Sequence, residues 1–222
     1  LRLLSKSLRP LPDKWHGLSD TDTRFRQRYV DLIVNEQARR VFEIRHAVVA
    51  SFRSTLAGRG FIEVETPILH VEVGGATARP FVTHHNTLNM PLYLRIATEL
   101  HLKRLIVGGL DRVFEIGRLF RNEGMDTTHN PEFTTMESYE AFGDATEAME
   151  LTEALLTNAA CDATGSTVVD INGTAVDLAE PWPRLRMVDL VSDAAGETVH
   201  PSQPVEHLRA LAERHGVRYE KT

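Results

Sequence analysis

Hydrophobic residues recur at helical spacing across residues 35–60, where we expect one long amphipathic helix. Residues three and four positions apart lie on the same face of a helix, and Gly58 and Gly60 are typical signals for its end. The next segment, residues 61–65, alternates apolar and charged side chains and is followed by Pro67, which predicts a short strand that stops at the proline. The apolar positions of the helix are Ala38, Val41, Phe42, Ile44, Val48, Val49, Phe52 and Leu56.

The pattern beyond residue 80 predicts a mixture of strands and helices. Asp144 followed by Glu147 indicates a capping box at a helix start, and Asn172 with Gly173 is typical of a tight hairpin turn. Because strands and helices do not alternate regularly, we predict an α+β fold with an antiparallel sheet flanked by helices, rather than a doubly wound sheet. We expect strands at 81–84, 93–96, 112–123 and 131–142, a hairpin at 168–178, and helices at 98–107, 144–162 and 205–215.

The composition is that of a globular chain with one sizeable core, since 42% of its 222 residues are hydrophobic and 25% are charged. No apolar run approaches the roughly 20 residues that would span a bilayer, so we expect a cytoplasmic protein without a membrane partner. The single cysteine, Cys161, excludes an intrachain disulfide, and we expect it in the core. A net charge of -6 does not by itself indicate a polyanion partner. Residues 6–22, rich in Pro, Asp, Ser and Gly, predict a linker.

Chemically versatile side chains concentrate on the two long predicted strands. Side chains of a strand repeat with a period of two, so alternate positions share a face. If the strands pair, one sheet face would present a guanidinium, two carboxylates, an aromatic ring and a phenol. These side chains are Arg121, Glu123, Phe133, Glu137 and Tyr139.

Such a face suits a ligand that has both phosphate and ammonium groups. Arg121 can grip phosphate oxygens with its rigid fork, and Phe133 can stack a base. Glu137 with Tyr139 can hold a cation. The alternative is a solvated sheet face with ordinary cross-strand salt bridges.

The same residues resemble a family. Residues 114–139 resemble motif 2 of class II aminoacyl-tRNA synthetases, and residues 60–69, Gly-Phe-Ile-Glu-Val-Glu-Thr-Pro-Ile-Leu, resemble motif 1. Phe-Arg-Asn-Glu-Gly, His-Asn-Pro-Glu-Phe-Thr and Glu-Ser-Tyr within motif 2 are similar to the lysine enzymes rather than to the aspartate or asparagine ones. Residues 74–85 and 93–100 also resemble the lysine enzymes. One departure is Thr98, where that family often has proline.

This resemblance implies an activity and a domain arrangement. The implied activity is lysine-tRNA ligation: ATP-dependent activation of lysine to lysyl-adenylate and transfer to tRNA(Lys). Residues 1–34 would be a linker from an N-terminal anticodon-binding domain, and residues 35–222 would be the N-terminal part of the catalytic domain. The implied fold is the class II synthetase sheet, incomplete at both ends, because motif 3 is not found. We therefore expect the isolated chain to be inactive.

The resemblance also implies a role for each site residue. Arg121 would be catalytic, contacting the α-phosphate of ATP and the carboxylate of lysine. Glu123, His129 and Phe133 would hold adenine and the outer phosphates. Gly75 and Glu99 would bind the α-amino group of lysine, while Glu137 and Tyr139 would approach its side-chain ammonium.

The implied partners are tRNA(Lys), L-lysine, ATP as a substrate, and a second copy of the chain. The homodimer would form through the motif 1 helix and strand. Mg²⁺ is the implied cofactor, with its ligands beyond residue 222 and none within this chain.

Several other side-chain groups have two interpretations each. His84 and His85 could suggest a metal site, but adjacent residues of a strand point to opposite faces and cannot easily share one ion. The basic triplet at positions 24, 26 and 28 could touch tRNA or could decorate the linker and the following helix. Glu63 and Glu65 could suggest acid–base chemistry, whereas the family context favours a dimer interface.

Three alternative functions stay open at the level of the sequence. A ligase of the same fold that attaches lysine to a protein would share His-Asn-Pro-Glu-Phe-Thr, but not the segments at 74–76 and 79–81. A module that supplies lysine for lipid modification is the second alternative. The third is a catalytically inactive module for regulation or dimerisation, which a downstream glycine-rich motif with its arginine would exclude.

Overall fold

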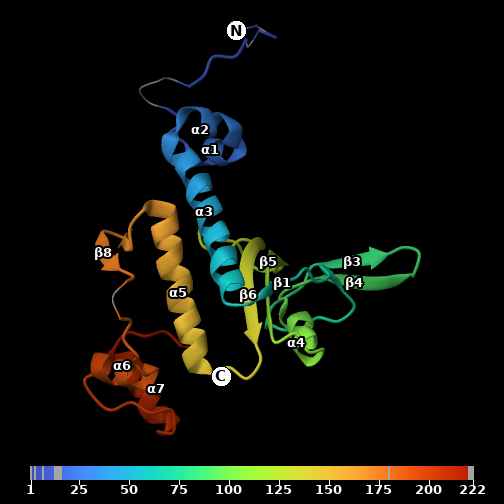
Figure 1. The fold of residues 1–222 in the computed structure, drawn as a ribbon. Coiled ribbons are helices and arrows are strands. Elements are labelled where there is room, and N and C mark those ends of the chain that lie inside the picture. The colour runs from blue at the N-terminus through green and yellow to red at the C-terminus, as the bar shows by residue number, and fades with distance from the viewer. Residues whose placement is uncertain (1, 3, 7, 13–16, 180, 220–222) are drawn as a thin grey trace. The chain divides into compact units, whose positions relative to one another are not determined.

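A computed structural model describes residues 2, 4–6, 8–12, 17–179 and 181–219, which form two compact units, Leu1–Ala179 and Glu180–Thr222 (Figure 1). The second unit contains α6 (Met187–Ala195) and α7 (Val205–Arg214). The helices of the first unit are α1 (Thr21–Arg26), α2 (Arg28–Val34), α3 (Glu36–Gly58), α4 (Glu99–Val107) and α5 (Ala145–Thr164). Its strands are β1 (Ile62–Glu63), β2 (Leu69–His70), β3 (Val82–His85), β4 (Met90–Leu94), β5 (Arg112–Phe120), β6 (Glu132–Glu140), β7 (Val168–Ile171) and β8 (Thr174–Asp177).

The central sheet has the strand order β1-β5-β6. Strands β5 and β6 pair antiparallel along their whole lengths, from Arg112 opposite Glu140 to Phe120 opposite Glu132, which confirms the predicted pairing of the two long strands. Strand β1 instead pairs parallel to β5, so the sheet is mixed rather than antiparallel throughout. A parallel pair needs a long crossover connection, and residues 64–111, which include the antiparallel sheet β2-β4-β3 and helix α4, provide it.

The hydrophobic core lies on one face of the β5–β6 pair. Helices α3 and α5 pack against each other there. Alternate residues of β5 and β6 point toward these helices, so the opposite face is left for other elements. The buried cluster consists of Leu56, Phe61, Phe114, Leu151 and Leu155, with Phe52, Ile116 and Met136 packed against it.

Local signals in the sequence correspond to the observed ends of several elements. The Asp144 carboxylate accepts a hydrogen bond from the Thr146 N–H at 2.5 Å, and Glu147 accepts one from the Asp144 N–H at 2.9 Å, which confirms the capping box at the start of α5. The β7–β8 hairpin turns at Asn172 and Gly173, whose φ angles are 54° and 85°. The predicted helices at 35–60, 98–107 and 205–215 are also present as α3, α4 and α7.

Three expectations differ from the structure. The strand predicted at 61–65 is limited to β1, and β5 ends at Phe120 rather than at residue 123, because the chain leaves the sheet for the polar loop. Cys161 is exposed on α5 rather than part of the core. The sequence also gave no indication of α6.

The region predicted as a linker contains two short helices. Asp31 of α2 is fully buried and accepts hydrogen bonds from Arg24, Arg28 and Asn35. Two of the three basic residues of the triplet therefore stabilise this helix pair. Residues 1, 3, 7, 13–16, 180 and 220–222 lie outside the described part, and the assignment of residues 1–34 to an interdomain linker stays a prediction.

None of the helices in the described ranges is long and apolar enough to cross a membrane.

Candidate functional site

Three of the predicted site residues, Phe133, Glu137 and Tyr139, lie on the face of the β5–β6 pair opposite the hydrophobic core. Leu119 pairs with Phe133, Glu115 with Glu137, and Val113 with Tyr139, and cross-strand partners share a face. The sequence prediction of a shared face for Phe133, Glu137 and Tyr139 is therefore confirmed.

Arg121 belongs to the same face although it follows the last residue of β5. Its N–H donates to the Pro131 carbonyl at 2.8 Å, so the pairing of the two strands continues one step beyond the strand. The Arg121 guanidinium carbon lies 5.3 Å from the centroid of the Phe133 ring, within the range of a cation–π contact. The two side chains that sequence analysis assigned to phosphate and base thus lie side by side.

A cavity of about 220 Å³ opens beside this pair of side chains. Glu123 lines it from the loop after β5, where its carboxylate also accepts a hydrogen bond from the Arg79 N–H at 3.2 Å. The structure therefore brings together all four residues predicted to contact ATP. The complete lining is Arg121, Glu123, Gly124, Thr128, His129, Asn130 and Phe133.

Asp126 makes hydrogen bonds within the loop that contains His129. Its carboxylate accepts hydrogen bonds from the Thr128 and His129 N–H groups at 2.7 and 2.8 Å, and it lies 2.8 Å from His129 Nδ1. These hydrogen bonds, first that from Thr128 and then those from His129, hold the pKa of Asp126 well below its usual range. Since the carboxylate is ionised, it only accepts, and His129 Nδ1 must bear the proton that lies between them.

Glu137 and Tyr139 form the opposite end of the face. Glu137 accepts a hydrogen bond from the Thr98 N–H at 3.1 Å on one oxygen and from the Tyr139 hydroxyl at 3.2 Å on the other. Burial, followed by the charges of Glu137 and Glu99, raises the pKa of Tyr139, so its phenol stays a neutral donor. One carboxylate fixed by two donors keeps its remaining lone pairs for a ligand cation.

Gly75 and Glu99 lie next to each other, as the resemblance implied. A Cβ atom at Gly75 would be 3.0 Å from the Cβ of Ala97 and 3.1 Å from that of Glu99, and the φ angle of Gly75 is 87°. Both the close approach and the left-handed backbone favour glycine here. The Glu99 carboxylate binds the ammonium of Lys103 at 2.6 Å, and this ammonium lies 5.8 Å from the Tyr139 ring.

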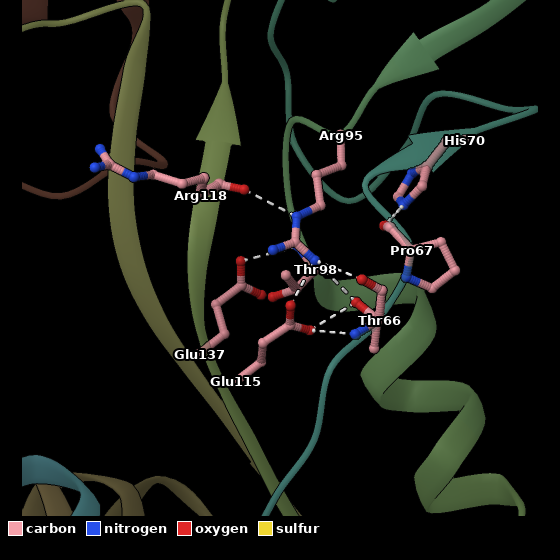
Figure 2. Close-up of polar contacts among 8 residues, drawn as sticks. All are labelled: Thr66, Pro67, His70, Arg95, Thr98, Glu115, Arg118 and Glu137. Carbon is pink, nitrogen blue, oxygen red and sulfur yellow. Dashed lines mark hydrogen bonds and ion pairs between the residues drawn. The ribbon is translucent and has the colours of Figure 1, made fainter.

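Sequence reasoning missed a buried ion pair behind these residues. Figure 2 shows the Arg95 guanidinium between the Glu115 carboxylate and Thr66, with Thr98 and Glu137 beside it. The side chains of Arg95 and Glu115 are 3% and 5% exposed, and their charged atoms are 2.5 Å apart. Glu115 shares the alternation of Arg121, and this signal could have assigned it to the same face. No pattern in the sequence indicates that Arg95, twenty residues earlier, is its partner.

Thr98, the departure from the family pattern, lies directly at the site. It is 2% exposed, and its hydroxyl oxygen has no hydrogen-bond partner within the described ranges. Its N–H is the donor to Glu137. A proline at this position could not make that hydrogen bond.

The remaining candidates take part in contacts within the chain. Glu63 accepts hydrogen bonds from Arg53 of α3 at 2.9 and 3.0 Å, which ties β1 to that helix. His85 accepts a hydrogen bond from the Leu88 N–H within the β3–β4 turn. The part of the chain that the structure describes contains no group of three or more His, Cys, Asp or Glu side chains that could hold a metal ion.

Comparisons with known proteins show the family of the chain. The model of the family "tRNA synthetases class II (D, K and N)" matches residues 20–220. The chain is 54% identical over 217 residues to a protein of Enterococcus faecalis named lysine--tRNA ligase, and 53% identical over 220 residues to one of the same name from Staphylococcus aureus. These matches cover 98% and 99% of the chain but 44% of each relative, so the chain spans less than half of their length. The chain belongs to the class II tRNA synthetase family that comprises the D, K and N enzymes.

Proposed function

We propose that this chain is the front part of the catalytic domain of a lysine-tRNA ligase, which activates lysine with ATP and transfers it to tRNA(Lys). The observation that supports this most directly is the single face of the β5–β6 pair. It has a guanidinium and an aromatic ring beside a cavity at one end, and a carboxylate with a phenol at the other. The names of the relatives point to the same activity.

The first chemical step needs a positioned cation rather than a general acid or base. One carboxylate oxygen of lysine attacks the α-phosphorus of ATP in line, a new P–O bond forms, and the bond to the leaving pyrophosphate breaks. Negative charge develops on the phosphoryl oxygens, and Arg121 would stabilise it. In the second step a ribose hydroxyl of tRNA attacks the lysyl carbonyl and AMP leaves.

The residues beside the cavity would hold the nucleotide. Phe133 offers a ring for stacking against adenine, and Glu123 and His129 would contact adenine and the outer phosphates. The Asp126 carboxylate fixes the ring of His129, which reduces the conformational entropy lost when phosphate binds. Mg²⁺ belongs to the same proposal, and none of these residues is assigned to hold it.

The other end of the face would select lysine. Glu137 and Tyr139 would pair with the side-chain ammonium, and Gly75 with Glu99 would receive the α-amino group. A ligand without the distal charge would leave the Glu137 carboxylate unpaired in a partly buried site, which is costly. Lys103 now pairs with Glu99, so a bound α-amino group would compete with this ammonium for the carboxylate.

A second copy of the chain is the proposed partner of α3 and β1. Val41 and Phe42 of α3 and Ile62 of β1 are large apolar side chains that are 64%, 54% and 51% exposed. Large apolar side chains that are exposed on a helix and on a strand favour burial against another protein surface. A cytoplasmic location, tRNA(Lys) as a partner, and residues 1–34 as a linker from an anticodon-binding domain belong to the same proposal.

Amino-acid-dependent exchange of pyrophosphate into ATP tests the proposed function. The complete protein that contains these 222 residues would be assayed with lysine, aspartate and asparagine, the amino acids of the three enzyme types in the family. We expect exchange with lysine alone, followed by lysylation of tRNA(Lys). Exchange with none of the three would favour the inactive binding module, and lysyl-adenylate formation without tRNA charging would favour a ligase for another acceptor.

A further inference from the structure

The short segment of residues 95–98 contacts both ends of the proposed lysine site. The Ile96 carbonyl accepts a hydrogen bond from Arg121 Nε at 3.4 Å. Two residues later the Thr98 N–H donates to Glu137 at 3.1 Å. One stretch of backbone therefore connects the guanidinium proposed to bind the lysine carboxylate with the carboxylate proposed to bind its ammonium.

The side chain of Arg95 fixes this segment from behind. Its Nε donates to the Arg118 carbonyl at 2.9 Å, and Nη1 donates to Glu115 at 2.5 Å and to the carbonyl and hydroxyl oxygens of Thr66, each at 3.1 Å (Figure 2). The backbone of Arg95 is also held, because its carbonyl accepts a hydrogen bond from the Phe120 N–H at 3.0 Å. Arg95 thus connects the start of the segment to β5 and to the chain after β1.

Glu115 completes the ion pair with its second oxygen. This oxygen accepts hydrogen bonds from the Thr66 N–H at 3.2 Å and the Thr66 hydroxyl at 2.6 Å. Gly117 leaves room for the guanidinium, since a Cβ atom there would lie 2.3 Å from Arg95 Nη2. A buried ion pair with additional hydrogen bonds on both partners is expensive to break, so its geometry is strongly specified.

We propose that the Arg95–Glu115 pair is a positioning device that sets the separation between Arg121 and Glu137, and with it the length of the amino-acid side chain that the site accepts. This inference rests on the proposed lysine-activating function. Arg121 and Glu137 are each hydrogen-bonded to the segment that Arg95 holds. A displaced Arg95 would therefore move the Ile96 carbonyl and the Thr98 N–H that contact them. The preference of the site for lysine over ornithine, whose side chain is one methylene shorter, would then decrease.

This role differs from a contribution to the hydrophobic core. The buried cluster around Leu56 and Phe114 lies on the other face of the β5–β6 pair, and neither Arg95 nor Glu115 belongs to it. A merely structural pair would change the stability of the protein, but the molecules that remain folded would keep their preference for lysine. The ratio of two substrates therefore separates the two roles.

The test uses Arg95→Lys, Glu115→Gln and Gly117→Ala in the complete protein. Gly117→Ala keeps both charges and displaces the guanidinium by steric contact alone. Matched controls are Arg112→Lys and Glu140→Gln, which alter a more exposed ion pair of 2.6 Å between β5 and β6, at the end of β5 away from Arg121. The values of kcat and KM would be measured for lysine and for ornithine in pyrophosphate exchange.

We expect the lysine-to-ornithine ratio of kcat/KM to fall about tenfold or more in the three variants, since one methylene is typically worth at least about that factor. The two controls should keep the ratio of the unaltered protein. Both substrates are measured on the same preparation, so an unfolded fraction cancels from the ratio.

An unchanged ratio in Gly117→Ala and Arg95→Lys would overturn the inference while leaving the proposed function intact. An equal fall in the controls would overturn it too, because any ion pair that involves β5 would then have the same effect. Absence of lysine-dependent exchange in the unaltered protein would instead reject the proposed function, and this inference with it.

Discussion

At the scale of single residues, the structure separates the side chains proposed for lysine from those proposed for ATP. Glu137 and Tyr139 lie toward one end of the β5–β6 face, whereas Phe133 lines the cavity at the other end. Arg121 lies at the cavity end and would contact both ligands. Substitutions at the two ends should therefore affect the two ligands differently.

Glu137→Gln tests this separation. Glutamine keeps the shape and an acceptor but removes the charge, and a charge-assisted hydrogen bond is roughly twice as strong as a neutral one. We expect lysine binding to weaken by about 2–4 kcal/mol and ATP binding by far less. Calorimetry with each ligand separately measures both losses in the complete protein. Equal losses would indicate a folding defect, and unchanged lysine affinity would remove Glu137 from the site.

Lys103→Gln tests the proposed competition at Glu99. The Lys103 side chain is 57% exposed, and exposed ion pairs contribute little. Because the substitution frees the Glu99 carboxylate, we expect the KM for lysine to fall by about two- to fivefold, with little change in the KM for ATP. A higher KM for lysine would instead mean that the Lys103 ammonium helps to build the site.

The sequence could predict which side chains share a face of a strand, because that depends on a period of two. It could not predict which residues from distant parts of the chain contact them. The alternation along residues 131–142 placed Phe133, Glu137 and Tyr139 on one face, and the structure agrees. The contact of Arg95 with Glu115 joins residues from different elements, so it depends on how the chain folds back rather than on any local pattern. The individual roles assigned to the site residues stay predictions.

At the scale of elements, β2 and α4 meet through two histidines. His70 is 8% exposed, and its ring centroid lies 4.6 Å from that of His101. Burial is the largest effect and lowers the pKa of both. The hydrogen bond with the Pro67 carbonyl opposes it for His70, and the charge of Glu115 opposes it for His101, while Arg95 and Arg104 lower the pKa of both further. Both rings are therefore favoured in their neutral forms in the folded protein.

These pKa shifts predict a loss of stability on mild acidification. A histidine whose pKa is lowered by folding takes up a proton more readily when unfolded, so the stabilisation is fully present above about pH 6.5 and falls as the pH drops below it. Urea unfolding of the chain at a series of pH values measures this. We expect His101→Gln to reduce the slope between about pH 6.5 and 5, and an unchanged slope would contradict the assignment.

Helix starts and turns that are set by neighbouring residues could be predicted. Strand pairings between residues far apart in the sequence could not. The capping box of α5 and the Asn172–Gly173 turn are encoded by adjacent residues. The parallel pairing of β1 with β5 joins Ile62 to Val113, and no local pattern distinguishes it from an antiparallel edge. Helices α1 and α2 have only six and seven residues, and α1 is polar, so no helical periodicity was evident there.

At the scale of the whole molecule, the exposed apolar side chains of α3 and β1 predict a homodimer. We expect the complete protein to sediment as a dimer at micromolar concentration, and Phe42→Asp to shift it toward monomer because a charge would be buried in the interface. Val107→Asp at the end of α4 is the control, since Val107 is 89% exposed but outside the proposed interface. A monomeric unaltered protein would contradict this prediction.

Lysine-dependent pyrophosphate exchange by Arg121→Ala in the complete protein tests the central claim most directly. Arg121 lies at the end of the shared face and lines the cavity, so removing it should delete the cation that we propose stabilises the transition state. We expect exchange to fall by about 100-fold or more, corresponding to about 3 kcal/mol, while circular dichroism and the unfolding midpoint stay unchanged. Near-normal exchange in the folded variant would contradict the account.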